Sequence, residues 1–441
     1  MSNGSKNRQR ILQKLGIEKL NPMQEEAHLA IHSCAEVLLL SPTGTGKTLA
    51  FLLPIISELD PDLSEVQTLI IVPSRELAIQ IEQVIREMGT GFKTNAVYGG
   101  RSGSKDRVDI KHRPAILVGT PGRVADHIRR HAFSVRHIKT LVLDEFDKSL
   151  EVGFEKEMSE IIAALDHVEK KILTSATQGV EIPDFVEWNE PVTVNFLSEG
   201  TSKLSLKTVL SPEKDKLDTL VDTLCHLGNQ PGIIFCNFKE TINRVSDFLT
   251  HHDISHGTFY GGLEQKDRER ALIKFRNGTH QLLLSTDLAA RGIDVPEIKF
   301  IIHYHLPLKG HEFTHRNGRT ARMKRDGSAY VLHWEQEKLP EYLPELGSEE
   351  NPIETLISTD KPQPSSWKTL FVSGGRRDKI SKGDIAGLFF HQGELKKDEL
   401  GIIELKNDCA FVAVKSSRAE RVVKLVSDTR LKKKKVRVTL I

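Results

Sequence analysis

Short apolar runs rich in β-branched residues recur along the first half of the chain, and a segment of helical length follows each of them. The clearest runs are residues 35–40, 68–72, 115–118, 140–143 and 171–173. Each run ends in turn or polar residues, as expected for the strands of β-α-β units around a parallel sheet. Active sites of such sheets gather at the carboxyl ends of the strands.

The same pattern restarts after about residue 200, with runs at residues 232–236, 281–285, 300–303 and 328–333. We therefore predict two α/β domains of similar size, covering residues 1–198 and 203–345. Residues 346–366 are acidic and contain three prolines, a composition typical of a linker. Residues 367–441 are then expected to form a small separate domain.

Charge is distributed unevenly behind the net value of +2. Residues 367–441 carry 18 lysines and arginines against 9 aspartates and glutamates, whereas the preceding residues carry 44 against 51. A basic module attached to a mildly acidic body is typical of a tethered nucleic-acid-binding domain. The alternative is a solvated lysine-rich end, although the excess extends beyond the run at 432–435.

Several classes of protein are disfavoured by what the sequence lacks. The four cysteines form no CxxC pair and the eighteen histidines are interpreted as solvated or core residues, so a disulfide or zinc framework is not expected. There is no apolar run of 18 residues, and the polar first residues do not resemble a signal peptide. We expect a cytoplasmic protein with no membrane segment.

A phosphate-binding loop is the first candidate for chemistry. The sequence Ser-Pro-Thr-Gly-Thr-Gly-Lys-Thr at residues 41–48 follows an apolar strand and precedes an apolar helix. Gly44 and Gly46 would allow the backbone amides to approach phosphate oxygens, Lys47 would neutralise the outer phosphates, and the Thr48 hydroxyl would ligate Mg²⁺. Ser41 stands where the generic pattern has glycine, so a glycine-rich turn is the alternative.

An acidic pair ends a later strand and would complete such a site. Asp144 and Glu145 directly follow the apolar run at 140–143. Asp144 would hold Mg²⁺, and Glu145 would orient the water that attacks ATP. An ordinary acidic pair at a strand end is the alternative, but the upstream loop disfavours it.

The phosphate-binding loop and the acidic pair belong to a set of motifs that resembles a known family. The tetrad Asp-Glu-Phe-Asp at residues 144–147 is similar to the signature of DEAD-box RNA helicases, with Phe146 where alanine is usual. Other motifs of that family occur in order over residues 15–335, at positions 73–78, 99–100, 120–123, 175–177, 233–237, 265–268, 285–287, 291–294 and 315–322.

The resemblance implies two tandem RecA-like parallel-sheet domains that bind and hydrolyse ATP with Mg²⁺ and bind RNA. It also assigns individual residues to catalysis, nucleotide binding, RNA binding and the coupling of hydrolysis to domain closure. Catalysis would use Lys47, Asp144, Glu145 and the arginine fingers Arg319 and Arg322. Nucleotide binding would use Gln24, which would read adenine, together with Ser41, Thr43, Gly44, Thr45, Gly46, Lys47, Thr48 and Asp294. The RNA backbone would lie on Arg75, Gly100, Thr120, Arg123, Arg268 and Thr286. Hydrolysis would be coupled to domain closure by Asp147, Ser175, Thr177 and His315.

Three departures from the family pattern matter for the expectations. Phe146 is larger than the usual alanine, so the packing beside the acidic pair should differ. Residues 5–8 contain no aromatic side chain where the family usually has one to stack on adenine. Asn317 and Ala321 alter the last motif, whose histidine and three arginines remain.

The last 75 residues are similar to an RNA-recognition-type βαββαβ domain. Residues 368–375 resemble its first strand, and residues 410–414 would be its third. Phe371 and Phe411 could stack on bases or belong to the core, and the sequence leaves both open. Residues 374–385 are similar to the C-terminal domain of the bacterial DEAD-box protein A (DbpA) type, which binds a hairpin of large-subunit ribosomal RNA. In this α+β domain the expected RNA contacts are Arg376, Arg377, Lys379 and Lys382.

The expected function is that of a monomeric ATP-dependent RNA helicase that remodels short structured RNA. The resemblance points to ribosomal RNA during large-subunit assembly, with a pre-ribosomal particle as a possible partner. One alternative is an RNA-binding clamp or scaffold with little ATP turnover. Another is a DNA helicase, which RNA stimulation that DNA fails to reproduce would exclude.

Overall fold

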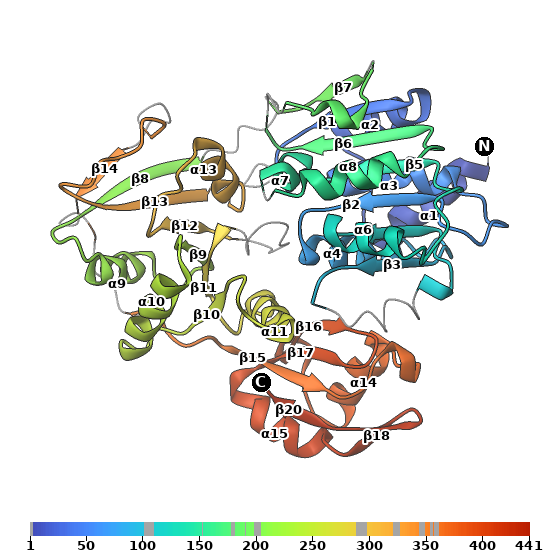
Figure 1. Ribbon diagram of the computed structural model, residues 1–441. Helices are drawn as coiled ribbons and strands as arrows, with labels where there is room; N and C mark the ends of the chain where they lie inside the picture. The colour runs from blue at the N-terminus through green and yellow to red at the C-terminus, as the bar shows by residue number, and fades with distance from the viewer. Residues whose placement is uncertain are drawn as a thin grey trace. The chain divides into compact units, whose positions relative to one another are not determined.

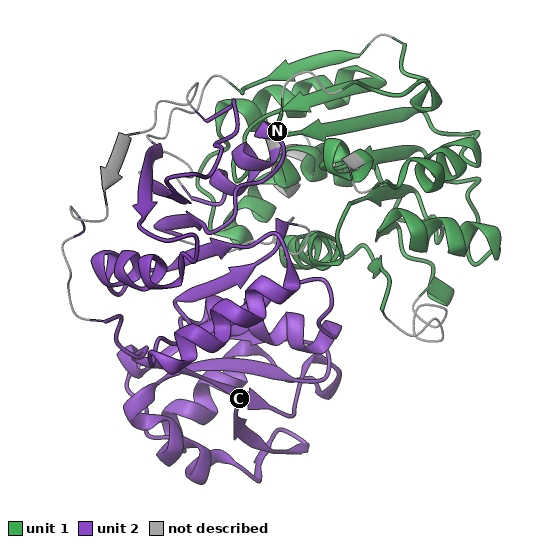
Figure 2. Cartoon of the chain, turned by 60° about the vertical axis from the view of Figure 1, so that its left-hand side comes forward, with its two compact units in different colours: residues 1–202, 291–294, 322–325 green, residues 203–290, 295–321, 326–441 purple. Residues whose placement is uncertain are grey.

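The computed structural model describes residues 3–100, 110–151, 153–177, 181–189, 191–197, 204–287, 298–320, 327–343, 349–352, 356 and 361–441. These residues divide into two compact units (Figure 2). The first unit holds residues 1–202, and the second holds the described residues from 204 onward. Each unit is considered by itself below.

The first unit is built on a seven-stranded sheet in which all neighbours are parallel, in the order β3-β4-β2-β5-β6-β1-β7 (Figure 1). The inner strands are short and apolar on both sides, as expected when helices cover both faces of a sheet. The strands are β1 (Glu36–Leu40), β2 (Thr68–Ile71), β3 (Thr94–Val97), β4 (Ile116–Gly119), β5 (Thr140–Leu143), β6 (Lys170–Ser175) and β7 (Val192–Asn195).

Helices cover both faces of this sheet. Alternate residues of β2 point to opposite faces, so Ile70 joins one core cluster and Leu69 joins the other. The first cluster also holds residues of α1 (Asn3–Leu15), α2 (Pro22–Ser33), α3 (Lys47–Glu58) and α4 (Arg75–Met88). The second holds residues of α6 (Pro121–Arg129), α7 (Phe146–Glu151), α8 (Glu155–Ala163) and the 3₁₀ turn η1 (Asp184–Val186).

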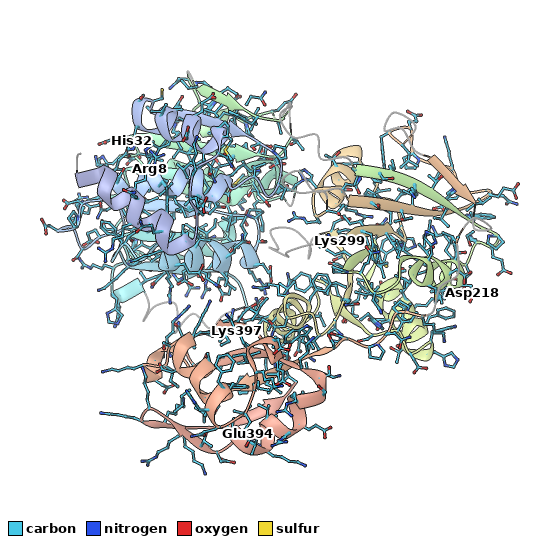
Figure 3. The ribbon with its side chains drawn as sticks, turned by 180° about the vertical axis from the view of Figure 1, so that it is seen from behind. Arg8, His32, Asp218, Lys299, Glu394 and Lys397 are labelled. Atoms are coloured by element: carbon cyan, nitrogen blue, oxygen red, sulfur yellow. The ribbon has the colours of Figure 1, made fainter. Side chains whose placement is uncertain are left out.

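The second unit contains another seven-stranded parallel sheet, in the order β10-β11-β9-β12-β13-β8-β14. Its strands are β8 (Leu204–Ser211), β9 (Gly232–Phe235), β10 (His256–Phe259), β11 (Leu282–Ser285), β12 (Phe300–His303), β13 (Gly327–Trp334) and β14 (Glu349–Pro352). The helices are α9 (Leu217–Leu227), α10 (Lys239–His251), α11 (Gln265–Arg276) and α13 (Gly310–Asn317). Figure 3 labels Asp218 at the start of α9 and Lys299 directly before β12.

Part of the predicted linker belongs to this second sheet. Residues 349–352 form β14, which pairs in parallel with β8 from Glu349 opposite Lys207 to Pro352 opposite Leu210. The acidic, proline-containing composition suggested only an irregular connection. A strand forms because β8 offers an open edge for backbone hydrogen bonds, and side-chain composition does not reveal such an edge.

The C-terminal residues fold into a small α+β domain inside the second unit. Its four-stranded antiparallel sheet has the order β16-β17-β15-β20. In chain order its elements are β15 (Trp367–Val372), α14 (Lys382–His391), β16 (Leu400–Leu405), β17 (Ala410–Lys415), α15 (Ser416–Val426) and β20 (Val438–Leu440). A hairpin of β18 (Thr429–Leu431) and β19 (Lys434–Val436) is inserted before β20. The predicted βαββαβ order is confirmed, with β15 as its first strand and β17 as its third.

One face of this small sheet lies against α11 and the turn that follows it. The Thr369 hydroxyl on β15 lies 2.7 Å from the Thr279 hydroxyl and accepts a hydrogen bond from Nδ2 of Asn277 at 3.2 Å. Glu404 on β16 forms an ion pair with Arg276 at 3.1 Å. Thr369 is fully buried. The second RecA-like domain therefore covers part of the sheet face that does not hold the small domain's own core.

The two phenylalanines that sequence left open lie on this covered face. Phe371 and Phe411 are cross-strand partners with ring centroids 5.6 Å apart. Phe411 is only 5% exposed, Phe371 is half-buried, and neither belongs to the core cluster on the helical side of the sheet. Phe411 is therefore shielded from solvent, which disfavours its use as a stacking platform for bases.

The chain thus has two parallel-sheet RecA-like domains and a small C-terminal antiparallel-sheet domain, as the sequence predicted. Among the described residues, no helix is both long enough and apolar enough to cross a membrane.

Candidate ATP site and RNA-binding residues

The phosphate-binding loop connects β1 to α3 in the first unit. Gly46 has φ 89°, and a Cβ atom there would lie 2.4 Å from Nε2 of Gln24, so the position requires glycine. Nζ of Lys47 donates to the carbonyl oxygens of Ser41 at 2.5 Å and Pro42 at 3.1 Å. The loop therefore wraps around a buried ammonium group at the start of α3, where amide groups and positive charge together suit phosphate.

Gln24 is held against this loop by the start of α2. Asn21 caps the helix, and the two side chains form a reciprocal capping box in which Gln24 N donates to Asn21 Oδ1 at 2.9 Å. Nε2 of Gln24 donates to the Gly46 carbonyl at 3.2 Å, and Nδ2 of Asn21 donates to the Thr45 carbonyl at 2.9 Å. The predicted adenine-reading residue is thus fixed beside the predicted phosphate site.

The acidic pair follows β5, two strands away from β1 in the sheet. Asp144 is buried, and its Oδ1 accepts a hydrogen bond from the Thr174 hydroxyl at 2.5 Å. Burial, with the negative charge of Glu145 beside it, raises the pKa of Asp144 to about 6, against the opposing effects of Thr174 and Lys47. Glu145 has φ 49°, a left-handed conformation that is uncommon outside glycine and accompanies functional strain in many sites.

These groups fit a divalent cation and a triphosphate. The Oε2 atom of Glu145 is buried without a hydrogen-bond partner among the described residues. The Thr48 hydroxyl likewise makes no hydrogen bond within the part of the chain that the structure describes. A buried carboxylate whose pKa is raised is stabilised by a nearby positive charge. Thr48 and Asp144 are therefore suited to hold Mg²⁺.

The predicted coupling residues of the first unit also come together. The Thr177 hydroxyl donates to Oδ2 of Asp147 at 3.2 Å and lies 3.2 Å from the Ser175 hydroxyl. The carbonyl of Ser175 accepts a hydrogen bond from the amide of Ser41 at 3.1 Å. This chain of contacts connects the end of β6 with both the acidic tetrad and the phosphate-binding loop.

Phe146 is accommodated in the core rather than in the site. It is 2% exposed and belongs to the cluster that includes Leu143, Met158, Leu173 and Val186. The packing beside the acidic pair therefore includes a large aromatic ring, which sequence predicted only as a difference from the usual alanine.

Four residues predicted to contact RNA lie at the carboxyl ends of β2, β3 and β4. Arg75 begins α4 after β2, and its guanidinium lies so close to Gly100 that a Cβ atom at Gly100 would be 2.6 Å from Nη1. Thr120 is the N-cap residue of α6, and Arg123 in the first turn of that helix pairs with Asp126 at 3.5 Å. The structure thus places these residues along one edge, beside the ATP site.

The corresponding edge of the second unit holds Arg268 and Thr286. Arg268 on α11 is 7% exposed, and its guanidinium lies 4.7 Å from the centre of the Phe259 ring at the end of β10. Ser285 ends β11 and donates to the carbonyls of Phe259 at 3.0 Å and Thr286 at 3.1 Å. The ends of β10 and β11 therefore bring these two predicted residues to the same edge.

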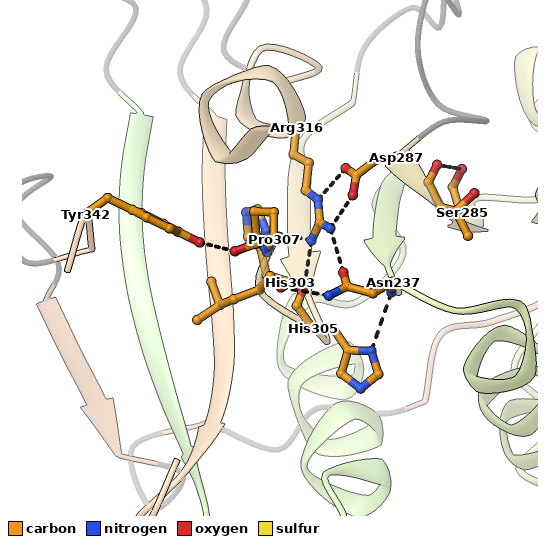
Figure 4. Close-up of polar contacts among 10 residues, drawn as sticks. Asn237, Ser285, Asp287, His303, His305, Pro307, Arg316 and Tyr342 are labelled. Carbon is orange, nitrogen blue, oxygen red and sulfur yellow. Dashed lines mark hydrogen bonds and ion pairs between the residues drawn. The ribbon is translucent and has the colours of Figure 1, made fainter. Parts of the chain in front are cut away.

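A buried arginine organises the end of the second sheet (Figure 4). Arg316 on α13 is 2% exposed and makes a bidentate ion pair with Asp287, with nitrogen–oxygen distances of 2.6 and 2.5 Å. It also donates to Oδ1 of Asn237 at 2.8 Å and to the His305 carbonyl at 2.5 Å. Arg316 thus joins the residues that follow β9, β11 and β12.

Sequence reasoning did not single out Arg316, Asp287 or Asn237 as site residues. A usable signal existed, because an arginine inside an otherwise buried motif needs a carboxylate partner. Asp287 lies directly beside Thr286 in the preceding motif. Position in two motifs predicted that these residues lie near the site, but not that Arg316 would be the arginine paired with Asp287.

A second buried contact supports α13. Nε2 of His303 donates to Oδ1 of Asn317 at 2.9 Å, and both side chains are buried. Burial, with Arg316 nearby, lowers the pKa of His303 to about 3, so the ring is neutral at physiological pH. Asn317, noted as a departure from the family motif, is therefore satisfied by a histidine at the end of β12.

The remaining predicted residues of this motif fall into two groups. His315 and Arg319 are 9% and 5% exposed and lie on α13 and directly after it. Asp294 and Arg322, predicted to contact the ribose and the triphosphate, lie outside the described residues.

The four predicted RNA contacts of the C-terminal domain surround the start of α14. Arg376 and Arg377 belong to the 3₁₀ turn η4 (Arg376–Asp378), Lys379 follows it with φ 59°, and Lys382 begins α14. The side chains of Arg377, Lys379 and Lys382 are exposed and form no ion pair with other described residues.

The basic hairpin is fixed beside that turn. Lys434 pairs with Asp378 at 2.8 Å, and Lys432 pairs with Asp384 at 2.7 Å. The hairpin therefore adds its lysines to the surface formed by η4 and the start of α14.

Family models match all three parts of the chain. The DEAD/DEAH box helicase model matches residues 21–185, and the helicase conserved C-terminal domain model matches residues 215–324. The DbpA RNA binding domain model matches residues 369–440. The match of the second model to the second unit and of the third to the small domain agrees with the fold.

Solved structures with similar folds include two with RNA. The S. cerevisiae Dbp5 structure bound to RNA and ADP BeF3 has a TM-score of 0.70 at 26% identity, covering 79% of this chain and 94% of that one. The Mss116p structure bound to ssRNA and AMP-PNP has a TM-score of 0.69 at 25% identity, covering 78% of this chain and 77% of that one.

Two curated relatives extend over nearly the whole chain. The Escherichia coli ATP-dependent RNA helicase DbpA is 28% identical, over 98% of this chain and 96% of that protein. The Bacillus subtilis ATP-dependent RNA helicase DbpA is 30% identical, over 97% of this chain and 96% of that protein. With the ATP-site geometry and the RNA-binding domain in place, the chain belongs to the DEAD-box ATP-dependent RNA helicases of the DbpA type.

Proposed function

We propose that this helicase couples ATP hydrolysis to the local opening of short structured RNA, with large-subunit ribosomal RNA as its target. The observation that supports the ATPase activity is the pair formed by the buried Asp144 and the half-buried Glu145 beside the phosphate-binding loop. The raised pKa of Asp144 and the unpartnered Glu145 oxygen suit a site that would gain the positive charge of a divalent cation when the metal–nucleotide complex binds.

Within this proposal each residue has a defined task. Lys47 stabilises the outer phosphates, Thr48 and Asp144 hold Mg²⁺, and Glu145 orients the attacking water. When bound, Mg²⁺ neutralises charge on the phosphate oxygens. Gln24 selects adenine through its amide.

The second RecA-like domain makes hydrolysis depend on RNA. Arg319 and Arg322 act as arginine fingers on the triphosphate when ATP and RNA together favour the closed form, and Asp294 contacts the ribose. Asp147, Ser175, Thr177 and His315 link closure to hydrolysis. RNA contacts at Arg75, Gly100, Thr120, Arg123, Arg268 and Thr286 position the strand without reading its sequence. The closed form is populated because both ligands bind it more tightly.

Targeting is assigned to the exposed basic surface around η4. Its arginines and lysines can neutralise phosphates, whereas the sheet face with Phe411 is shielded. The C-terminal domain thus tethers a structured RNA near the helicase domains and raises the local RNA concentration. The resemblance of residues 374–385 to the DbpA type supports a hairpin of large-subunit ribosomal RNA, within a pre-ribosomal particle, as that RNA.

The experiment compares ATPase rates with a panel of RNAs for the full chain and for Arg377→Glu/Lys379→Glu. A fragment of large-subunit ribosomal RNA containing hairpins should stimulate the wild type most, and the variant should lose that preference while poly(U) stimulation persists. Arg421→Glu/Lys424→Glu on α15 is the control with the same charge change. An unchanged RNA preference in the first variant would contradict the targeting role.

The same assay decides between the helicase and a clamp with little turnover. RNA-stimulated ATP turnover with strand release supports the helicase, and turnover at background with ribosomal RNA present supports the clamp. Equal stimulation by DNA of the same sequence would contradict an RNA-specific enzyme.

A further inference from the structure

The first unit contains a groove that the ATP and RNA sites do not use. It has a volume of about 630 Å³ and is lined by residues from the starts of three strands and the ends of two helices. Glu65 precedes β2, Arg113 precedes β4, Arg136 precedes β5, and Ala164 follows α8.

This position separates the groove from the predicted catalytic residues. The ATP and RNA residues follow the carboxyl ends of the strands, whereas the groove lies at their amino ends. Strands β2, β4 and β5 have four residues each, so about 13 Å of sheet lies between the two edges. A ligand in the groove would leave the nucleotide site accessible.

The lining combines an apolar floor with a basic rim. The floor is formed by Ile110, Ile128, Phe133 and Val135. The rim carries Lys111, Arg113, His131 and Arg136, all exposed. Glu65 is the acidic member of the lining and is already paired with Arg113.

The basic rim contrasts with the rest of the unit. Residues 1–202 carry 23 lysines and arginines against 28 aspartates and glutamates. Lys111, His131 and Arg136 have no ion-pair partner within the described part of the chain. Positive charge therefore remains available around an apolar floor in a domain with an acidic balance.

Two rim residues stand in left-handed turns where glycine would fit with less strain. His131 has φ 48° and follows α6, where its amide donates to the Ile128 carbonyl and the Ala132 amide donates to the His127 carbonyl. This is the hydrogen-bond pattern of a helix end that usually has glycine at that position. Arg113 has φ 45° in a turn closed by a bond to the Ile110 carbonyl. In both turns a basic side chain replaces the residue that the backbone favours.

We propose that this groove binds an acidic peptide segment of a partner protein, with an aliphatic or aromatic anchor on the floor and carboxylates on the rim. Charge complementarity selects such a segment, because the rim offers cations and the floor offers apolar surface for one or two side chains. RNA fits less well, since the floor is mainly aliphatic and offers only Phe133 as an aromatic ring on which a base could stack. The proposal is independent of the RNA target proposed above.

A phage-displayed library of random dodecapeptides, selected on the full-length protein, tests the proposal. We expect enrichment of peptides that combine aspartate or glutamate with aromatic or aliphatic residues. Their affinity should fall about tenfold or more for Lys111→Glu/Arg136→Glu. Lys19→Glu/Lys156→Glu, with the same charge change on exposed positions of the first unit, should bind as the wild type does.

Several outcomes would overturn the proposal. These are a failure to enrich any peptide, enrichment of peptides without acidic residues, and equal binding by the groove variant. Displacement of the enriched peptide by a poly(U) oligonucleotide would assign the groove to RNA instead.

Two substitutions to glycine distinguish a binding role of the rim side chains from a structural one. In His131→Gly and Arg113→Gly the turns lose their strain, so the urea midpoint should stay the same or rise while peptide affinity falls several-fold. If the rim side chains serve only to neutralise the helix ends beside them, stability should fall and peptide affinity should not change. RNA-stimulated ATPase activity serves as the control for intact folding.

Discussion

The two RecA-like domains share one topology and differ in the chemistry of a single sheet edge. If β8 to β14 are counted from one to seven, both sheets have the strand order 3-4-2-5-6-1-7. After the fifth strand the first domain has Asp144 and Glu145, whereas the second has Tyr304 and His305. The first edge is acidic and the second is organised around Arg316.

The lysines at the start of the helix that follows the first strand of each domain show the same contrast. Lys47 begins α3, and its ammonium donates to loop carbonyls in the phosphate-binding loop. Lys216 is the N-cap residue of α9, is buried, and is paired with Glu337 at 3.1 Å and the Leu332 carbonyl at 2.9 Å. Burial lowers the pKa of Lys216 despite its carboxylate partner.

The shared topology places the carboxyl ends of the strands at the same edge of both sheets. The few residues that follow the strands determine what that edge can bind. A carboxylate pair beside a loop of amide groups suits a metal–nucleotide complex. An edge with buried arginine suits the positioning of further positive groups for phosphate. Under the proposed function, the first domain would hold the nucleotide and the second would supply arginines to it.

The largest expected effect follows from removing the water-orienting group from the acidic edge. Glu145→Gln should lower RNA-stimulated ATP hydrolysis by about 10²–10⁴-fold, because the amide cannot accept a proton from the attacking water. ATP and RNA binding should persist, as measured by fluorescence titration with a labelled nucleotide and a labelled RNA. Retained turnover at the wild-type rate would contradict the assignment of Glu145.

The next largest effect is expected from the buried arginine of the second edge. Arg316→Met should lower the free energy of unfolding by about 3–5 kcal/mol, because methionine cannot replace the bidentate ion pair with the half-buried Asp287. The Asn237 amide oxygen and the His305 carbonyl would lose their donor as well. Urea unfolding followed by hydrogen exchange of β12 measures this loss. The double variant Arg316→Met/Asp287→Leu should recover part of it, and a double variant less stable than the single one would contradict the ion-pair explanation.

The fold was more predictable from sequence than these edge contacts. Runs such as 140–143 and 300–303 matched β5 and β12 because fully buried parallel strands are continuous apolar segments. The predicted runs included none of the edge strands β3, β7, β10 and β14, nor the inner strand β8. Strand β7, for example, alternates mostly exposed residues with a buried valine. The pairing of the edge strands depends on an open sheet edge, which local composition does not encode.

The candidate site was predictable where a motif carries the chemistry in its own spacing. The phosphate-binding loop and the acidic pair are brought together by β1, β6 and β5 as the alternation of strands and helices implies. The bond between His303 and Asn317 was not predictable, because it joins an ordinary strand residue to a motif position across the core. The covering of Phe411 was also not predictable, since it depends on a contact with another domain.

A moderate gain in the free energy of unfolding is expected when Asp144, at the acidic edge, is replaced by a neutral residue. Burial raises the pKa of Asp144 from 3.8 to about 6, so its ionised form opposes folding at neutral pH. Asp144→Asn should therefore raise the free energy of unfolding of the first unit by about 3 kcal/mol at pH 7.5 in the absence of nucleotide. The gain should disappear below about pH 4, where Asp144 is protonated in both folded and unfolded chains. ATP hydrolysis should be lost, and a variant that is destabilised at pH 7.5 would contradict this explanation.

The smallest expected effect is a change in the free energy of unfolding when the pH falls from 7.5 to 5.5. This change should have opposite signs in the two domains. The folded pKa of Asp144 is raised, so the folded first unit binds a proton and should gain about 0.8 kcal/mol from this group. The pKa of His303 is lowered from 6.5 to about 3 by burial and Arg316, so only the unfolded second unit binds that proton. The second unit should lose about 1.4 kcal/mol.

Matched variants isolate these two contributions from those of other titrating groups. Hydrogen exchange of β5 in increasing urea compares the wild type with Asp144→Asn, and exchange of β12 compares the wild type with His303→Asn. Asparagine at 303 can still hydrogen-bond Asn317 but does not titrate, so the acid sensitivity of the second unit should decrease. The wild type and its variant should differ in how stability changes with pH, with opposite signs in the two domains. Differences of the same sign would contradict the protonation states assigned to Asp144 and His303.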